Sequence, residues 1–389
     1  MAKRTQSTGP TVERVLCVGV VAGRRHKSLW SLNDSLEELA ELARSSGGRV
    51  VGTVSQRLKA PTQTYLGKGK IDEIKALQDA KKFDVLICDD ELAPSQQRNL
   101  EAALEDVKVM DRTALILDVF ARRAQTREGR LQVELAQHEY LLPRLAGQWT
   151  HLERQRGGVR SGIGTVGPGE TQIETDRRLI RNRVLKIKKE LEAVRRQRGQ
   201  HRTRRDQQGV PVVGLVGYTN AGKSTLLNAM TKAGVATEDR LFSTLDPITR
   251  RLRLPSGHEM LLTDTVGFIQ KLPPLVVNAF RATLEEIESA TVLLHVVDMS
   301  HQNASAQAQT VEDILDEMHL GDRPRILVLN KVDLLESKAM QTEAMMNIGS
   351  HPRTVITSAL TGQGLDQITA ELEAAATGEP SPTAGAVAG

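Results

Sequence analysis

One glycine-rich segment of the chain has the residue types and the spacing of a phosphate-binding loop. An apolar stretch at 212–216 leads into Gly217-Tyr218-Thr219-Asn220-Ala221-Gly222-Lys223-Ser224-Thr225, and a helix-like sequence follows. Successive backbone N–H groups of such a loop, together with the N-terminus of the next helix, surround phosphate oxygens. We expect Lys223 to contact the β- and γ-phosphates and the hydroxyl of Ser224 to bind Mg²⁺. The sequence therefore predicts a nucleoside triphosphate site.

A carboxylate and a glycine follow a second expected strand, at 260–263. This strand ends at Asp264-Thr265-Val266-Gly267. An acid at the end of a strand beside the phosphate-loop strand can hold Mg²⁺ through water, and the amide of Gly267 can reach the γ-phosphate. The pattern means little alone, but its position behind the phosphate loop makes it strong support for the same site.

A third expected strand, at 325–329, ends at a motif that selects the base. The motif is Asn330-Lys331-Val332-Asp333. The carboxylate of Asp333 can accept hydrogen bonds from N1–H and from the exocyclic amine of guanine, whereas adenine offers neither donor there. A site built for such bonds rejects the analogue by factors of roughly 10⁴. With Ser358-Ala359-Leu360 completing the pocket, the expected nucleotide is GTP, with GDP as the product.

The segment between the phosphate loop and Asp264 is expected to be the switch that senses the γ-phosphate. It contains Phe242-Ser243-Thr244-Leu245-Asp246, which we also assign to the nucleotide site. One threonine must offer its hydroxyl to Mg²⁺ in the triphosphate state, and the motif register favours Thr244 over Thr249. The expected metal ligands are Ser224, Thr244 and Asp264. The residues expected to act in hydrolysis are Lys223, Thr244 and Gly267.

The position after Gly267 carries Phe268, where many small GTPases have a glutamine that orients the attacking water. Phenylalanine can neither donate nor accept a hydrogen bond, so we expect slow hydrolysis unless the backbone, another side chain or a partner positions the water. Asn220 has two interpretations. In some GTPases without the glutamine, an asparagine there helps to hold K⁺; alternatively, Asn220 only hydrogen-bonds the loop.

Strand-like and helix-like segments alternate along most of the chain, which predicts an α/β fold. Residues 208–377 are expected to form a P-loop domain with a doubly wound, mostly parallel sheet. Before it, strand-like runs at 13–22, 48–56, 83–88 and 107–110 predict a small α/β subdomain within residues 1–122.

Residues 123–207 contain helix-like runs on both sides of a glycine-rich stretch, which predicts a long antiparallel helical pair. A helix-like run at 130–145 is followed by a glycine-rich stretch at 157–169. Apolar residues then recur at spacings of three and four, as in a helix that packs on a partner helix. They are Ile173, Ile180, Val184, Ile187, Leu191 and Val194. We expect 199–208 to be a polar linker and 378–389 a disordered tail.

Positive charge is concentrated in the second helix of this pair. Residues 177–205 contain 13 Lys and Arg against two acids, a net of +11, so the other residues carry 4 − 11 = −7. A solvated helix face is the plain interpretation, but this density favours a polyanion, with RNA first. We expect no DNA partner.

The composition narrows the class further. Aromatic residues make up 3% of the chain, which argues against a platform for stacking single-stranded bases. Cys17 and Cys88 lie in apolar, strand-like runs and are expected to be buried and unbonded. No apolar run approaches the roughly 18 residues of a membrane helix. A cytoplasmic, monomeric protein is expected, and peripheral association with a membrane surface stays an alternative.

Several further segments follow the pattern of one GTPase family. Residues 162–178 (GIGTVGPGETQIETDRR) match its glycine-rich signature, and 64–70, 89–92 and 111–113 match its N-terminal domain. Residues 242–247 match its switch, and Phe268 its hydrophobic replacement of the glutamine. From about residue 13 to 375 the chain thus resembles the HflX family of translational GTPases.

The resemblance implies a partner and a task. HflX-like proteins bind the large ribosomal subunit, are stimulated by it, and split or recycle stalled or idle ribosomes, notably under stress. The tip of the helical pair reaches toward the peptidyl-transferase region, so the implied rRNA contacts are Gly162, Gly164, Gly167, Gly169, Arg177 and Arg178. An alternative is a ribosome- or RNA-binding occupancy factor in which hydrolysis only resets binding; a third is action on other RNA.

The chain departs from the family at two places. Val166 stands where the loop usually carries a basic residue, and a helix at 365–376 with a short tail stands where many members carry a further domain. The run Gly67-Lys68-Gly69-Lys70 before a helix could bind a second nucleotide, but it lacks the other features of a phosphate loop, so a structural turn or an RNA contact is the better interpretation.

Overall fold

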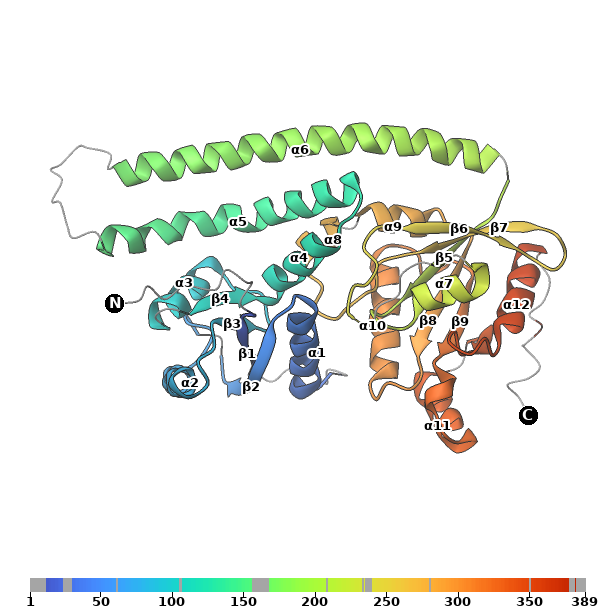
Figure 1. Cartoon of the computed structure of the whole chain (residues 1–389), viewed down its shortest axis with the longest axis horizontal. Coiled ribbons are helices and arrows are strands. Elements are labelled where there is room, and N and C mark those ends of the chain that lie inside the picture. The colour runs from blue at the N-terminus through green and yellow to red at the C-terminus, as the bar shows by residue number, and fades with distance from the viewer. Residues whose placement is uncertain are drawn as a thin grey trace, which may run out of the picture. The chain divides into compact units, whose positions relative to one another are not determined.

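The computed structural model describes residues 12–23, 30–60, 62–104, 107–155, 168–207, 209–232, 240–279, 281–349 and 351–377, with Gly234 and Pro382. The chain forms two compact units. The first combines Met1–Val119 with Pro143–Gly169, and the second combines Phe120–Leu142 with Glu170–Gly389. The expected fold class, an α/β chain with a P-loop sheet, a smaller α/β part and a helical pair, is confirmed (Figure 1).

The first unit is built on a four-stranded parallel sheet. Its strands are β1 (Arg14–Ala22), β2 (Arg49–Leu58), β3 (Val85–Cys88) and β4 (Lys108–Asp111), in the order β2-β1-β3-β4. The helices between and after them are α1 (Leu32–Ser45), α2 (Lys68–Lys81), α3 (Pro94–Ala103) and α4 (Arg112–Arg123). Cys17 and Cys88 are free and fully buried, as predicted.

A six-stranded sheet forms the centre of the second unit. Its strands are β5 (Val212–Gly217), β6 (Ile248–Arg253), β7 (Glu259–Asp264), β8 (Val292–Asp298), β9 (Arg325–Asn330) and β10 (Thr354–Ile356). The order is β10-β9-β8-β5-β7-β6, and all neighbours are parallel except β6 and β7. Since β5 lies between β7 and β8, its carboxyl end is the point where the strand order reverses, which is where ligands bind in such sheets.

Short connections and helices surround this sheet. The helices are α7 (Lys223–Thr231), α8 (Pro274–Ala279), α9 (Arg281–Glu288), α10 (Ala304–Glu317), α11 (Lys338–Ile348) and α12 (Leu365–Thr377), with a 3₁₀ turn at Val332–Leu334. All six residues of β5 and all seven of β8 are buried, as expected for central parallel strands covered on both faces.

The helical pair consists of α5 (Arg127–Gln155) and α6 (Pro168–Gln207). Within the second unit the two helices run antiparallel (Figure 1), and Leu131 and Leu135 pack against Ile187 and Leu191. Val184, Ile187 and Leu191 are buried, so the predicted seam is confirmed over this stretch. Pro143 lies inside α5.

The predicted linker at 199–208 is wrong, because α6 continues as a helix to Gln207. The arginines and glutamines around Gly199 are good helix formers, and one glycine lowers helix stability by only about 1 kcal/mol. The predicted disordered tail at 378–389 lies outside the described residues, apart from Pro382.

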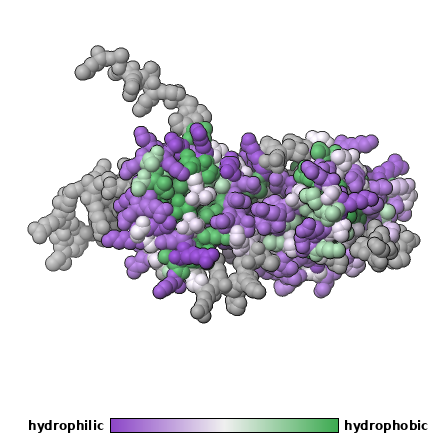
Figure 2. Space-filling model, turned by 90° about the horizontal axis from the view of Figure 1, so that it is seen from below, coloured by the Kyte–Doolittle hydropathy of each residue, from purple (hydrophilic) through white to green (hydrophobic). Residues whose placement is uncertain are grey.

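On the face seen in Figure 2, hydrophilic residues predominate among those that are coloured, and hydrophobic residues gather in patches between them. Among the helices that the structure describes, none is long and apolar enough to span a membrane.

A candidate nucleotide site

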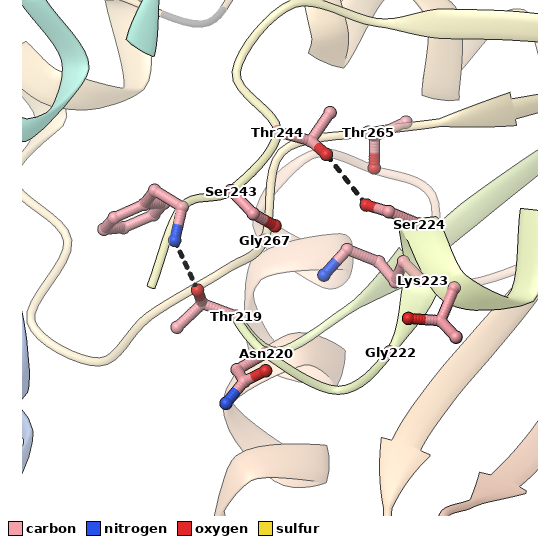
Figure 3. A pocket seen from close by; sticks show the side chains of 11 residues that line it. Thr219, Asn220, Gly222, Lys223, Ser224, Ser243, Thr244, Thr265 and Gly267 are labelled. Carbon is pink, nitrogen blue, oxygen red and sulfur yellow. Dashed lines mark hydrogen bonds between the residues drawn. The ribbon is translucent and has the colours of Figure 1, made fainter. Parts of the chain in front are cut away.

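The phosphate loop connects β5 to α7 and lines a pocket (Figure 3). Lys223, the first residue of α7, is buried, and its ammonium group donates to the carbonyls of Gly217 (3.1 Å) and Tyr218 (2.8 Å). Burial lowers the pKa of Lys223 to about 8, against a smaller opposing effect of Asp264. A phosphate group in this pocket would favour the charged lysine. The pocket-lining residues are Thr219, Asn220, Gly222, Lys223, Ser224, Thr225, Phe242, Ser243, Thr244, Thr265 and Gly267.

Three oxygen-bearing side chains from separate elements meet beside Lys223. The hydroxyl of Ser224 donates to Asp264 Oδ2 at 2.6 Å, and that of Thr244 donates to the same oxygen at 2.9 Å. The two hydroxyls lie 2.8 Å apart (Figure 3). The structure thus brings together the three side chains that the sequence assigned to a metal.

These side chains suit a hard divalent cation. Asp264 is fully buried, and its Oδ1 atom has no hydrogen-bond partner among the described residues. Burial raises the pKa of Asp264, whereas Lys223, Ser224 and Thr244 lower it. Magnesium prefers oxygen ligands, keeps several waters and usually takes one or two carboxylates together with substrate phosphates. A buried carboxylate beside two hydroxyls at a phosphate loop fits that preference.

The switch segment contributes Phe242, Ser243 and Thr244 to the lining of the pocket. The hydroxyl of Thr219 in the phosphate loop accepts a hydrogen bond from the backbone N–H of Phe242 at 2.9 Å. Thr249, the alternative to Thr244, lies on β6, and its hydroxyl is 2.9 Å from that of Thr263. Of the two threonines, Thr244 is therefore the one that faces Ser224 and Asp264.

Gly267 and Phe268 pack tightly on the phosphate loop. A side chain at Gly267 would come within 2.6 Å of Thr219 Cα and 3.0 Å of Lys223 Nζ, so only glycine fits there. Phe268 is fully buried, its N–H donates to the carbonyl of Gly217 (3.1 Å), and its carbonyl accepts from Thr219 (2.8 Å). The residue at the position of the missing glutamine therefore points into the protein interior.

The base motif is rigidly attached to the phosphate loop. The side chain of Asn330 donates to the carbonyl of Ala221 at 2.9 Å and accepts from the N–H of Ala359 at 3.0 Å. Asp333 lies on the 3₁₀ turn after β9 and is exposed, which leaves its carboxylate accessible to a base. Ser358 is buried, whereas Leu360 is 79% exposed.

Asp298, at the end of β8, contacts the base motif, and this contact was not predicted from the sequence. Its carboxylate lies 2.8 Å from the ammonium group of Lys331 in the base motif. The sequence could have indicated this contact. The parallel neighbours β8 and β9 end in the polar residues Asp298 and Asn330 at the same edge of the sheet.

Not every residue assigned to the site lines the pocket. The assigned residues that do not line it are Gly217, Tyr218, Ala221, Leu245, Asp246, Asp264, Val266, Asn330, Lys331, Val332, Asp333, Ser358, Ala359 and Leu360. Asp246 points elsewhere, because its carboxylate accepts hydrogen bonds from the backbone N–H groups of Gln125 (2.8 Å) and Thr126 (2.9 Å).

Only some of the residues assigned to RNA are among the described residues, and these lie in the first turns of α6. Gly162, Gly164 and Gly167 are outside the described residues, as is Val166. Gly169 is the second residue of α6, and of the two arginines further along this helix Arg177 is half-buried and Arg178 exposed. Several cations of α6 are paired with acids of its own unit, namely Arg183 with Glu134, Lys188 with Glu139, Arg195 with Glu285 and Arg198 with Glu128. The net charge of +11 thus overstates the charge free to meet a polyanion.

Three family models match consecutive parts of the chain. The model described as "GTP-binding GTPase N-terminal" matches residues 33–121, and "GTP-binding GTPase Middle Region" matches 123–205. The model described as "50S ribosome-binding GTPase" matches 212–331, which includes the phosphate loop and the site described above.

Curated relatives match most of the chain. A protein of Alkalihalophilus pseudofirmus is 50% identical over 323 residues, which is 83% of this chain and 74% of that protein. One of Escherichia coli K12 is 46% identical over 347 residues, 89% of this chain and 80% of that protein. Both carry the name GTPase HflX. A crystallised GTP-binding protein of Sulfolobus solfataricus in complex with GDP is 22% identical, covers 94% of this chain and 99% of its own, and has a TM-score of 0.46.

Proposed function

The chain belongs to the HflX family of GTPases and hydrolyses GTP, and from this premise we propose that its GTP cycle controls binding to the large ribosomal subunit. In this proposal the bound protein splits, recycles or rescues stalled or idle ribosomes, notably under stress. The observation that carries the proposal is the match of residues 212–331 to a ribosome-binding GTPase model, on a domain whose phosphate loop and switch are assembled.

The proposed roles at the site follow from its geometry. Ser224 and Thr244 would hold Mg²⁺ directly and Asp264 through water, and the ion would neutralise charge on the β- and γ-phosphate oxygens. Lys223 would contact the same phosphates, and the amide of Gly267 would meet the γ-phosphate. Asp333 would accept the two hydrogen bonds from guanine, with Asn330 and Ser358-Ala359-Leu360 shaping the pocket.

The attacking water needs another source of orientation, because Phe268 is buried and apolar. We propose that the backbone near Gly267, or a partner that orders the switch, supplies it. Asn220 is exposed at the mouth of the pocket, where it could help to hold K⁺. If hydrolysis needs an ordered switch, the protein alone should turn over GTP slowly, and a ribosome that orders the switch should make turnover faster.

The proposed ribosomal contacts lie on the helical pair. Gly162, Gly164, Gly167 and Gly169 would let the backbone approach rRNA closely, and Arg177 and Arg178 would neutralise phosphates. The protein would then be a monomer that is associated with ribosomes in the cytoplasm.

The first test is GTP turnover by the purified protein, alone and with large ribosomal subunits. We expect slow basal turnover that rises about tenfold or more with subunits, a change of about 1.4 kcal/mol in the barrier. Lys223→Ala should lower both rates by about a hundredfold, as expected for loss of a group that stabilises transferring phosphate. If large ribosomal subunits do not change the turnover rate, the GTPase activity is still supported, but the proposed ribosomal role is refuted.

A non-hydrolysable GTP analogue separates splitting timed by hydrolysis from simple occupancy. If 70S particles separate as well with the analogue as with GTP, occupancy by the GTP-bound form is sufficient, and hydrolysis only resets binding. If separation needs GTP itself, hydrolysis times the step. Sucrose-gradient profiles of 70S particles with each nucleotide give the answer.

A further inference from the structure

The switch segment is fastened to the start of the helical pair by Asp246. Its carboxylate accepts from the backbone N–H groups of Gln125 and Thr126 and from the hydroxyl of Thr126. Thr126 directly precedes α5, and its own hydroxyl oxygen accepts from the N–H of Gly129 at 3.0 Å. Asp246 therefore extends the N-terminal cap of α5 from a segment 120 residues away in sequence.

The chemistry of this contact favours a carboxylate. The first N–H groups of a helix have no partner within it, and the partial positive charge at a helix N-terminus attracts an anion. Thr126 directly precedes α5, so its N–H is one of these groups, and the carboxylate of Asp246 that accepts from it also brings negative charge to the helix N-terminus. Because the switch supplies the carboxylate, this part of the cap exists only while the switch has its present conformation.

A second anchor lies on the other side of Thr244. The ring of Phe242 packs edge-on against the ring of Phe120, with centroids 4.8 Å apart and planes at 89°. Both rings are buried. Phe120 belongs to the last turns of α4, just before the segment that Asp246 contacts.

Thr244 lies midway between the two anchors. Its hydroxyl is 2.8 Å from that of Ser224 and 2.9 Å from Asp264 Oδ2. With only Ser243 and Leu245 separating it from Phe242 and Asp246, Thr244 has little freedom to leave this position while both anchors hold. Release of either anchor would free the threonine hydroxyl from the metal-binding side chains.

We propose that Asp246 is a positioning residue for GTP hydrolysis, which holds Thr244 at the metal site by capping α5 and so couples the switch to the helical pair. The inference rests on the proposed role of Thr244. It also supplies a route by which a partner on the helical pair would order the switch, because fixing the first turn of α5 fixes the groups that Asp246 binds.

Two substitutions test this from opposite sides of the contact. Asp246→Ala removes the carboxylate. Gly129→Ala leaves the switch sequence intact, but its new Cβ would collide with Asp246 Oδ1. Alanine is a better helix former than glycine, so a purely structural role of Gly129 predicts a helix that is no less stable. Gly199→Ala is the matched control, since a Cβ there meets nothing within 4 Å on α6.

The readout is kcat and KM for GTP, together with GDP affinity and melting temperature. We expect Asp246→Ala and Gly129→Ala to lower kcat about tenfold, because Thr244 acts only in the triphosphate state. GDP affinity should stay within about twofold of wild type, as expected for a contact that is made in the triphosphate state and not with GDP. Gly199→Ala should behave as wild type.

The inference is overturned if either variant keeps the wild-type kcat, or if GDP affinity falls together with kcat, which would indicate general damage to the site. All of these measurements use the isolated protein. A failure of ribosomal stimulation would therefore refute the proposed function without affecting this test, and the reverse also holds.

Discussion

Phe268 illustrates how one residue can constrain a reaction through its position rather than its chemistry. Its side chain is fully buried, and both of its backbone polar groups bond the phosphate loop. The backbone bonds hold the segment after β7 against the phosphate loop, and the ring fills space in the protein interior. The chain has therefore replaced a mobile catalytic group with a structural one.

Restoring a glutamine at position 268 should for this reason fail to restore activity. Phe268→Gln would bury a carboxamide without partners and leave a void, at a combined loss of about 3 kcal/mol in the free energy of unfolding. We expect a lower melting temperature and no gain in turnover. Phe268→Leu, which stays apolar, should lose less stability. A glutamine variant that is as stable as wild type and faster would contradict the burial argument.

Among single residues, the sequence predicted those that stand at a fixed position within a sequence motif. Ser224, Thr244 and Asp264 each stand at a fixed place in a motif, and the structure brings their oxygens together. The bonds of Asp246 could not be foreseen, because its partners, Gln125 and Thr126, are joined to it only by the tertiary fold. Asp298 was foreseeable from its strand end, yet no motif draws attention to it.

At the scale of elements, α6 combines an apolar seam with ion pairs to α5. Ile187 is fully buried between the helices, whereas Leu185, two residues away, is 66% exposed. Periodicity predicted this seam because spacing of three and four residues places side chains on one face. The end of α6 was mispredicted, since polar residues with high helix propensity look like a linker when no seam accompanies them.

The two neighbouring residues provide a matched test of the seam. Ile187→Ala should lower the free energy of unfolding by about 2–4 kcal/mol, because it leaves a cavity between α5 and α6. Leu185→Ala should change it by less than about 0.5 kcal/mol, as expected for an exposed position. Urea denaturation followed by circular dichroism measures both. Equal losses for the two variants would show that the helices do not pack along this seam.

At the scale of the whole molecule, a buried histidine in the central sheet links stability to pH. His295 on β8 is 2% exposed, and its Nδ1 atom lies 2.9 Å from a carboxylate oxygen of Glu312. Since a carboxylate only accepts, Nδ1 carries the hydrogen. Burial, aided by Arg325 and Lys223, lowers the pKa of His295 to about 3.

Acidification should therefore destabilise the folded chain through His295. The unfolded state takes up a proton near pH 6.5, while the folded state stays neutral down to about pH 3. Stability is thus lost as pH falls through 6.5, by up to about 1.4 kcal/mol per pH unit for this one proton. Between pH 7.5 and about pH 5, the melting temperature of His295→Asn should fall by less than that of wild type.

The exposed His319 is the control for this experiment, because it has a positive φ of 58° that asparagine tolerates. His319→Asn should keep the pH dependence of wild type. If His295→Asn also keeps it, other groups account for the acid sensitivity, and the histidine already ionises in the folded protein.

The boundary between the two compact units falls inside α5, between Leu142 and Pro143. A proline has no N–H to donate, so the carbonyl of Glu139, four residues earlier, lacks its helical partner, and the ring crowds that carbonyl. Helices bend most readily at such points. Within α5, the turn that ends at Pro143 is therefore held by one hydrogen bond fewer than its neighbours, so this turn opens at a lower cost in free energy.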